Sequence, residues 1–276
     1  MALFIPGLLT AYWLATNHLG ARPITETLHE TGLWGIRLLA ITLAITPFRQ
    51  VFAQPKIVLL RRMLGVAAFS YLVIHFCFYI VDQKYALGTV ASEILRRFYL
   101  TIGFSALLIL TALAVTSTDG MMRRLRKRWQ LLHRLAYLVA ILGTVHYFIQ
   151  TKLNVYEPTW FAGVIGWLLL YRVMAHWLGV RRASSIWALA ILSIGVGILT
   201  AIGEYGYYAI FTGVRAGRVW DANFMLKAGV RPGWIAMAIG IGVTILATLW
   251  KTLEKWRNNA PASRIGAVQA RRGAGS

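Results

Sequence analysis

The sequence predicts an all-α protein that crosses a membrane several times, a polytopic membrane helix bundle, and three observations lead to this class. The chain has 276 residues, of which 58% are apolar and only 14% are charged. The apolar residues are grouped in long blocks, and short basic segments separate the blocks. A block of about 20 apolar residues crosses the hydrocarbon core as a helix, whose backbone hydrogen bonds are all internal.

Hydropathy predicts eight spans in order along the chain. They cover residues 1–16, 33–48, 63–81, 98–116, 129–150, 159–178, 185–211 and 233–250. The first two are short for a hydrocarbon core of about 30 Å. The first also lacks a preceding basic segment and a small-residue cleavage site, so we expect it to be a retained helix and not a signal peptide.

The basic residues predict the orientation of these spans. The loops after the second, fourth and sixth spans, together with the C-terminal tail, carry 17 Lys and Arg residues, and the remaining loops carry nine. Cytoplasmic loops are the more basic ones, so both termini are predicted to face the cytoplasm of a bacterial inner membrane. The formal charge of +20 follows these loops and does not indicate nucleic-acid binding. The basic segment 121–128 is expected to attract anionic membrane lipid.

Three histidines inside predicted spans are the candidate functional residues. His75 and His146 lie near the outer ends of the third and fifth spans, at the same depth. His133 lies about 20 Å nearer the cytoplasm, from the rise of a helix. An ionisable side chain in a bilayer is costly and usually has a partner. Haem iron takes imidazole as an axial ligand, so we predict an outer haem b between His75 and His146.

His133 leaves several alternatives open. It could hold a second haem, with Met63, a water, a residue of another helix or nothing as the opposite ligand. All three histidines could instead bond to neighbouring helices, or relay protons in a transporter. Arg37, near the level of the outer haem, is a candidate ligand for a haem propionate, although it could equally reach the membrane interface.

Six segments of the predicted spans and their ends form a recognisable set: Ile45-Thr-Pro47, Arg61-Arg-Met-Leu-Gly65, Thr116-Ser-Thr118, Arg128-Trp-Gln-Leu-Leu-His133, Tyr137-Leu-Val-Ala-Ile-Leu142 and Val145-His-Tyr147. This set resembles the MsrQ (YedZ) family, a member of the ferric reductase-like transmembrane superfamily. The resemblance covers residues 17–177. It implies a six-helix ferric reductase-like core within a haem-binding domain at residues 1–182. Outside the resemblance, hydropathy predicts two additional transmembrane helices at 183–255, and a composition rich in Ala, Gly and Arg predicts a disordered cytoplasmic tail at 256–276.

The resemblance also implies a function and partners. His75, His133 and His146 would be the haem-associated histidines, with one or two haems, and FMN would be a further cofactor. The chain would be an electron-transfer subunit that takes electrons from quinone or from a cytoplasmic flavin reductase. It would pass them to a periplasmic molybdopterin methionine sulfoxide reductase resembling MsrP, which repairs oxidised proteins. A ferric or quinone reductase that acts without this partner is the alternative within redox chemistry.

Overall fold

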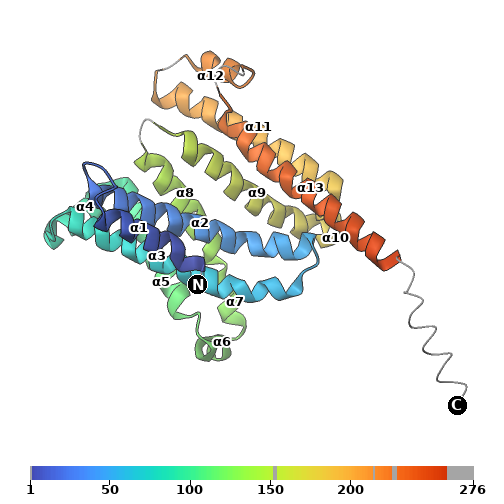
Figure 1. Cartoon of the computed structure of the whole chain (residues 1–276), viewed down its shortest axis with the longest axis horizontal. Coiled ribbons are helices and arrows are strands. Elements are labelled where there is room, and N and C mark those ends of the chain that lie inside the picture. The colour runs from blue at the N-terminus through green and yellow to red at the C-terminus, as the bar shows by residue number, and fades with distance from the viewer. Residues whose placement is uncertain (1, 152–153, 214, 226–228, 260–276) are drawn as a thin grey trace, which may run out of the picture.

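The computed structural model describes residues 2–151, 154–213, 215–225 and 229–259, and every regular element in these ranges is a helix. Seven of the described helical segments are long and apolar enough to cross a membrane, and they run side by side in Figure 1. They are α2 (Pro23–Val51), α3 (Leu60–Asp82), α5 (Phe98–Val115), α7 (Lys127–His133) continued by α8 (Leu135–Gln150), α9 (Tyr156–Leu178), α11 (Ile186–Phe211) and α13 (Pro232–Asn259). The predicted class of multi-span helical membrane protein is therefore confirmed.

Short helices mark the two ends of this bundle. We name one end the α4 end, after α4 (Leu87–Arg96), and α12 (Ala216–Ala222) also lies there (Figure 1). The opposite end, the α6 end, carries η2 (Pro55–Leu59), α6 (Asp119–Leu125) and α10 (Val180–Ala183). Successive spans alternate in direction between these ends.

The first predicted span is wrong. After a single turn, η1 (Ala2–Phe4), the helix α1 (Ile5–Ala15) has only 11 residues, a rise of about 16 Å. It starts beside Tyr71, at the middle of α3, where the Tyr71 hydroxyl accepts from Gly7 N at 2.7 Å and donates to Leu3 O at 3.0 Å. Since α1 is too short to cross, the structure has seven candidate spans within the described residues, and the expectation that both termini lie on one side loses its support.

The helix at the second predicted span is longer than the apolar block from which the span was predicted. The helix α2 begins at Pro23, ten residues before the apolar block, in a segment that contains Glu26, His29 and Glu30. This polar segment is helical because one side of it packs on α3 and buries Thr27, Leu28 and Thr31. The two threonine hydroxyls donate to backbone carbonyls one turn earlier, at 2.8 Å each, so their burial leaves no hydroxyl without an acceptor.

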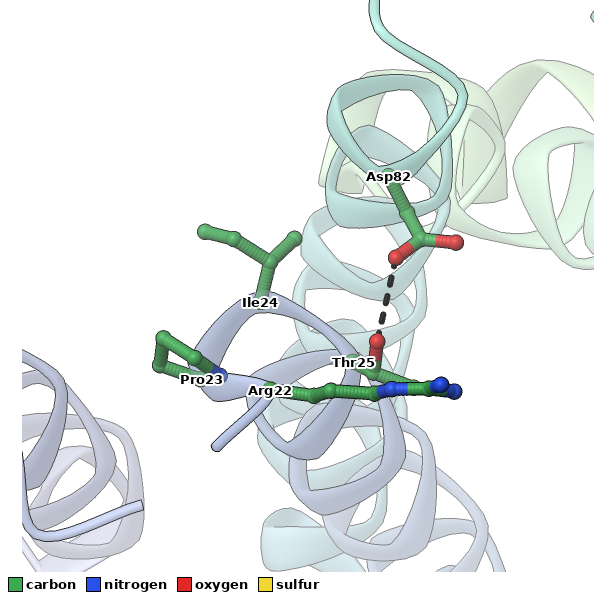
Figure 2. A pocket seen from close by; sticks show the side chains of 5 residues that line it. All are labelled: Arg22, Pro23, Ile24, Thr25 and Asp82. Atoms are coloured by element: carbon green, nitrogen blue, oxygen red, sulfur yellow. Dashed lines mark hydrogen bonds between the residues drawn. The ribbon is translucent and has the colours of Figure 1, made fainter. Parts of the chain in front are cut away.

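A hydrogen bond at the α4 end joins the first turn of α2 to the last turn of α3. Figure 2 shows the Thr25 hydroxyl and the Asp82 carboxylate directed toward each other, at 3.1 Å, beside a surface hollow of about 410 Å³ lined by residues 22–25 and Asp82. The bond holds the two antiparallel helices in one register. It therefore helps to place Leu28, one turn further along α2, at the level of His75 on α3.

At the α6 end, Arg172 completes the backbone of α2. Pro47 lies inside α2 and has no N–H, so the carbonyl of Leu43, four residues earlier, loses its helical donor. The Arg172 guanidinium, on α9, donates to this carbonyl and lies 5.2 Å from the ring centre of Tyr137 on α8. A buried arginine thus ties three spans together and satisfies the acceptor that the proline leaves free.

The two C-terminal spans pack on the rest of the bundle through α9. An ideal Cβ added to Gly233 of α13 would lie 2.8 Å from the Gly197 carbonyl of α11, so these helices approach at backbone distance. On the α9 side, the Trp167 indole donates to Ser193 of α11 at 3.0 Å. The helix α13 continues to Asn259, so the predicted tail is helical at residues 256–259, and residues 260–276 lie outside the described part.

A buried ion pair between Glu204 of α11 and Arg231, just before α13, gives a stability prediction. The Glu204 side chain is only 1% exposed and that of Arg231 is 19% exposed. Glu204→Ala should lower the free energy of unfolding by about 3–5 kcal/mol, because Arg231 would keep its charge inside the protein without a partner. Denaturant titration of the purified protein measures this loss. Glu26→Ala, at an exposed carboxylate, is the control, and a loss for Glu204→Ala no larger than the control's would contradict the prediction.

Candidate functional site

The His75 imidazole, on α3, is oriented by the backbone of α2. Its Nδ1 lies 2.7 Å from the carbonyl oxygen of Leu28. A carbonyl only accepts, so Nδ1 carries the proton and donates. The other ring nitrogen, Nε2, then holds a free lone pair, and none of the described residues bonds to it. This is the tautomer in which a histidine binds a metal through Nε2.

His146, on α8, is held in the same way by α5. Its Nδ1 lies 2.8 Å from the carbonyl oxygen of Tyr99. The ring therefore has the same tautomer as His75, with Nε2 available. Both residues are partly buried and lie in the halves of α3 and α8 that are nearer the α4 end, as the helical rise from the sequence predicts.

A glycine on the supporting helix makes room for each ring. A Cβ added at Gly32 of α2 would lie 2.7 Å from His75 Nδ1, and one added at Gly103 of α5 would lie 2.7 Å from His146 Nδ1. Real Cβ atoms do not approach other atoms so closely, so any side chain at these positions would displace the ring. The two glycines are functional residues that the sequence reasoning missed.

The two halves of the site are an internal repeat. Leu28, Gly32 and His75 in the first half correspond to Tyr99, Gly103 and His146 in the second, and every member lies 71 positions after its counterpart. Each half is a pair of packed helices, α2 with α3 and α5 with α8. This constant offset of 71 positions is the sequence signal that could have revealed the two glycines.

The two imidazole rings lie at a separation that is compatible with one metal ion between them. Their ring centroids are 6.4 Å apart, with an angle of 83° between the ring planes. A metal–imidazole nitrogen bond is about 2 Å long, and each nitrogen lies about 1 Å from its ring centre, so a metal between two imidazoles separates the centroids by about 6 Å. The centroid separation is therefore compatible with one ion held between His75 and His146.

The ligand set suits a haem iron. Within the part of the chain that the structure describes, no group of three or more His, Cys, Asp or Glu side chains gathers as a metal site. A zinc ion needs four ligands, whereas haem iron takes only its axial ligands from the protein. The porphyrin leaves the two axial positions of its iron free, and two imidazoles could fill them.

His133, on α7, is held differently. Its ring stacks on Trp129, with centroids 3.9 Å apart, and its Nε2 lies 3.1 Å from the Thr116 hydroxyl of the turn after α5. That hydroxyl donates to Ala112 O at 2.7 Å, so Nε2 of His133 donates to the hydroxyl oxygen. The nitrogen that is free in His75 and His146 is therefore engaged in His133.

The internal repeat places Arg62 where a histidine opposite His133 would be expected. Arg62 forms an ion pair with Asp119 of α6, which the sequence had not suggested, and its guanidinium lowers the pKa of the Asp119 carboxyl. Met63, the thioether considered as a second ligand, has a side chain 53% exposed at the surface of the bundle. The structure thus does not bring His133 together with His75 and His146, and a second haem stays a prediction.

Arg37 already has partners. Its guanidinium donates to Glu157 of α9 at 3.0 Å and lies 5.3 Å from the ring centre of Trp34. Both members of this ion pair are partly exposed, with 35% and 41% of their side chains accessible. The predicted contact between Arg37 and a haem propionate remains a prediction, and it would have to form beside Glu157.

This arrangement of helices and histidines agrees with a known class of membrane protein. Residues 31–144 match the family described as ferric reductase like transmembrane component, a segment that includes His75 and His133 and ends two residues before His146. The fold and site therefore define a ferric reductase-like transmembrane protein.

Individual relatives narrow this class. A protein of Xanthomonas axonopodis pv. citri is 46% identical over 159 residues, which cover 57% of this chain and 73% of the relative. A protein of Rhodospirillum rubrum is 41% identical over 191 residues, 67% of this chain and 90% of the relative. Both are described as the heme-binding subunit MsrQ of protein-methionine-sulfoxide reductase. The chain belongs to the MsrQ family, and no solved structure matches it.

Proposed function

We propose that this protein is a haem b-containing membrane subunit that passes electrons to a periplasmic molybdopterin methionine sulfoxide reductase. The observation that carries the proposal is the opposed pair His75 and His146, each with Nδ1 bonded to a backbone carbonyl and Nε2 free. The names of the relatives support haem binding and the methionine sulfoxide system. FMN, which the sequence resemblance implied, is not part of those names and stays a prediction.

The protein's own residues would set the properties of the site. A bound haem b supplies a reversible one-electron couple at its iron. The hydrogen bonds to Leu28 O and Tyr99 O make each imidazole a stronger electron donor through Nε2 and stop the rings from rotating. Each Nδ1 already carries a proton that is bonded to a carbonyl, and each Nε2 would be bound to iron, so these two rings would take up no proton when the oxidation state changes.

The distribution of basic residues supports the direction of transfer. The loops at the α6 end, which contain Lys56, Arg123 and Arg124 among others, are the more basic ones, so we assign this end to the cytoplasm. The histidine pair then lies near the outer face, where a soluble periplasmic partner is within reach. Electrons would enter from quinone or from a cytoplasmic flavin reductase, and these two donors are alternatives.

Reoxidation of the reduced protein tests the proposal. Reduction of a methionine sulfoxide to methionine consumes two electrons and two protons and releases water. The reduced haem spectrum should disappear when both the periplasmic reductase and a methionine sulfoxide substrate are added, and should persist when either is omitted. His146→Ala protein is the control and should support no turnover. Equal reoxidation by ferric chelates alone, with no effect of partner and substrate, would favour a ferric reductase instead.

A further inference from the structure

The helix α4 has an apolar face that the rest of the bundle only partly covers. At about 100° per residue, its apolar side chains fall within an arc of about 140° on one side of the helix. Val90, at one edge of this arc, is 5% exposed and packs on the bundle. Leu87 and Leu95 are 64% and 82% exposed. Half of the apolar face is therefore left uncovered by the described part of this chain.

The depth of α4 is fixed by the spans on either side. Four residues, 83–86, separate it from α3, and one residue, Arg97, separates it from α5. Lys84 and Tyr85 have φ angles of 52° and 61°, in the left-handed region, so the chain reverses sharply at the end of α3. The Thr101 hydroxyl of α5 donates to Ile94 O of α4 at 2.6 Å. These connections hold α4 against the ends of α3 and α5, at the level where the spans leave the membrane.

The exposed apolar residues of α4 continue onto a membrane span. Phe98, the first residue of α5, is 73% exposed and follows Leu95 by three residues, after the extended residue Arg97. A lipid layer that covers the start of α5 would therefore lie beside the end of α4. The opposite side of α4, with Thr89, Ser92 and Arg96, is polar.

The charges around α4 suit a lipid headgroup layer. Asp82 and Glu93, the nearby carboxylates, are bonded to Thr25 and Arg97 respectively. Lys84 and Arg96 are exposed and are not engaged by any described carboxylate. Long cationic side chains that flank an apolar helix in the interface reach the phosphates of the headgroup layer.

We propose that α4 is an in-plane anchor in the outer membrane interface. Leu87, Leu95 and Phe98 lie in the acyl boundary, Lys84 and Arg96 lie at the level of anionic headgroups, and the side with Thr89 and Ser92 faces water. A soluble partner that docks at this end therefore meets the polar side of α4 and not Leu95. The anchor does not depend on haem, although its assignment to the outer leaflet rests on the proposed orientation.

Spin labels on opposite sides of α4 test this placement. Cys77 is the only cysteine, so Cys77→Ser provides the background for two single-cysteine variants, Leu95→Cys and the matched control Ser92→Cys. Each full-length protein is labelled and reconstituted in vesicles of phosphatidylethanolamine and phosphatidylglycerol. Oxygen concentrates in the acyl region and a nickel chelate stays in water, so the ratio of their effects on relaxation should be several-fold higher at position 95 than at position 92.

Other outcomes would overturn the proposal. Equal ratios at the two positions would place both sides of α4 in water. Low accessibility of position 95 to both agents would mean that protein covers it, in a second copy of the chain. If the label at position 95 becomes inaccessible to both agents only when a soluble partner is added, Leu95 would be part of a docking surface.

The role of the cations is tested by varying the lipid. The label at position 95 should lie deeper in vesicles that contain phosphatidylglycerol than in vesicles of phosphatidylcholine alone. This difference should be lost when Lys84→Gln and Arg96→Gln are combined. A depth that is the same in both vesicles would overturn the headgroup contacts.

Discussion

Replacement of either His75 or His146 with Ala should abolish the low-spin haem spectrum of the purified protein. Each imidazole would supply one axial ligand, and a single imidazole leaves the opposite side of the iron open. The near-perpendicular ring planes, 83° apart, should also give the intact ferric protein the strongly anisotropic low-spin EPR signal of crossed imidazoles. The ratio of haem to protein, with absorption and EPR spectra, measures the effect.

Two controls separate loss of a ligand from loss of the fold. The variants should still insert, because removal of a buried polar group favours the membrane. Added imidazole should restore a low-spin spectrum to His75→Gly or His146→Gly, a rescue that a merely structural histidine would not show. His133→Ala should keep the low-spin signal of the outer pair, since Thr116 and Trp129 hold His133 elsewhere. Retention of the full low-spin spectrum in both alanine variants would show that His75 and His146 are not the axial ligands.

Substitution of Ala for Gly32 or Gly103 should reduce haem binding nearly as strongly. The added methyl group would lie 2.7 Å from Nδ1 of His75 or His146, so the ring must move and its bond to the Leu28 or Tyr99 carbonyl must lengthen. A ligand that is misplaced by this much no longer aligns Nε2 with the opposite ring. We expect a lower haem-to-protein ratio and a shift toward high-spin absorption, of similar size in both variants because the two halves are repeats.

The matched control is Gly195→Ala, in α11. An added Cβ there has no neighbour within 4 Å, and Ala is favoured over Gly in a helix by about 1 kcal/mol. It should keep the haem content and the thermal stability of the parent. If Gly32→Ala and Gly103→Ala bind haem as well as Gly195→Ala does, then the rings are not held in the way that the structure shows.

The depth of the histidines was predictable from sequence because it depends only on helix direction and rise. Once α3 and α8 run in opposite directions, His75 and His146 are level, whatever lies around them. The partner of Arg37 could not be predicted in this way, because the position of Arg37 on α2 does not indicate a contact with Glu157, which lies 120 residues later. The short helix α1 was misjudged because its apolar composition resembles that of a span, although it has only 11 residues and starts beside the middle of α3.

The sequence by itself determined the class of membrane protein, five of the seven spans to within about a turn, and the three histidines, because hydropathy and helical rise are local properties. Only the tertiary structure decided which ring nitrogens are free, why Gly32 and Gly103 are needed, and that α2 extends ten residues beyond its apolar block. Each of these depends on contacts between helices whose residues are far apart along the chain. Burial against a neighbouring helix and the reach of one side chain to another backbone are set by packing, which spacing within a single helix does not contain.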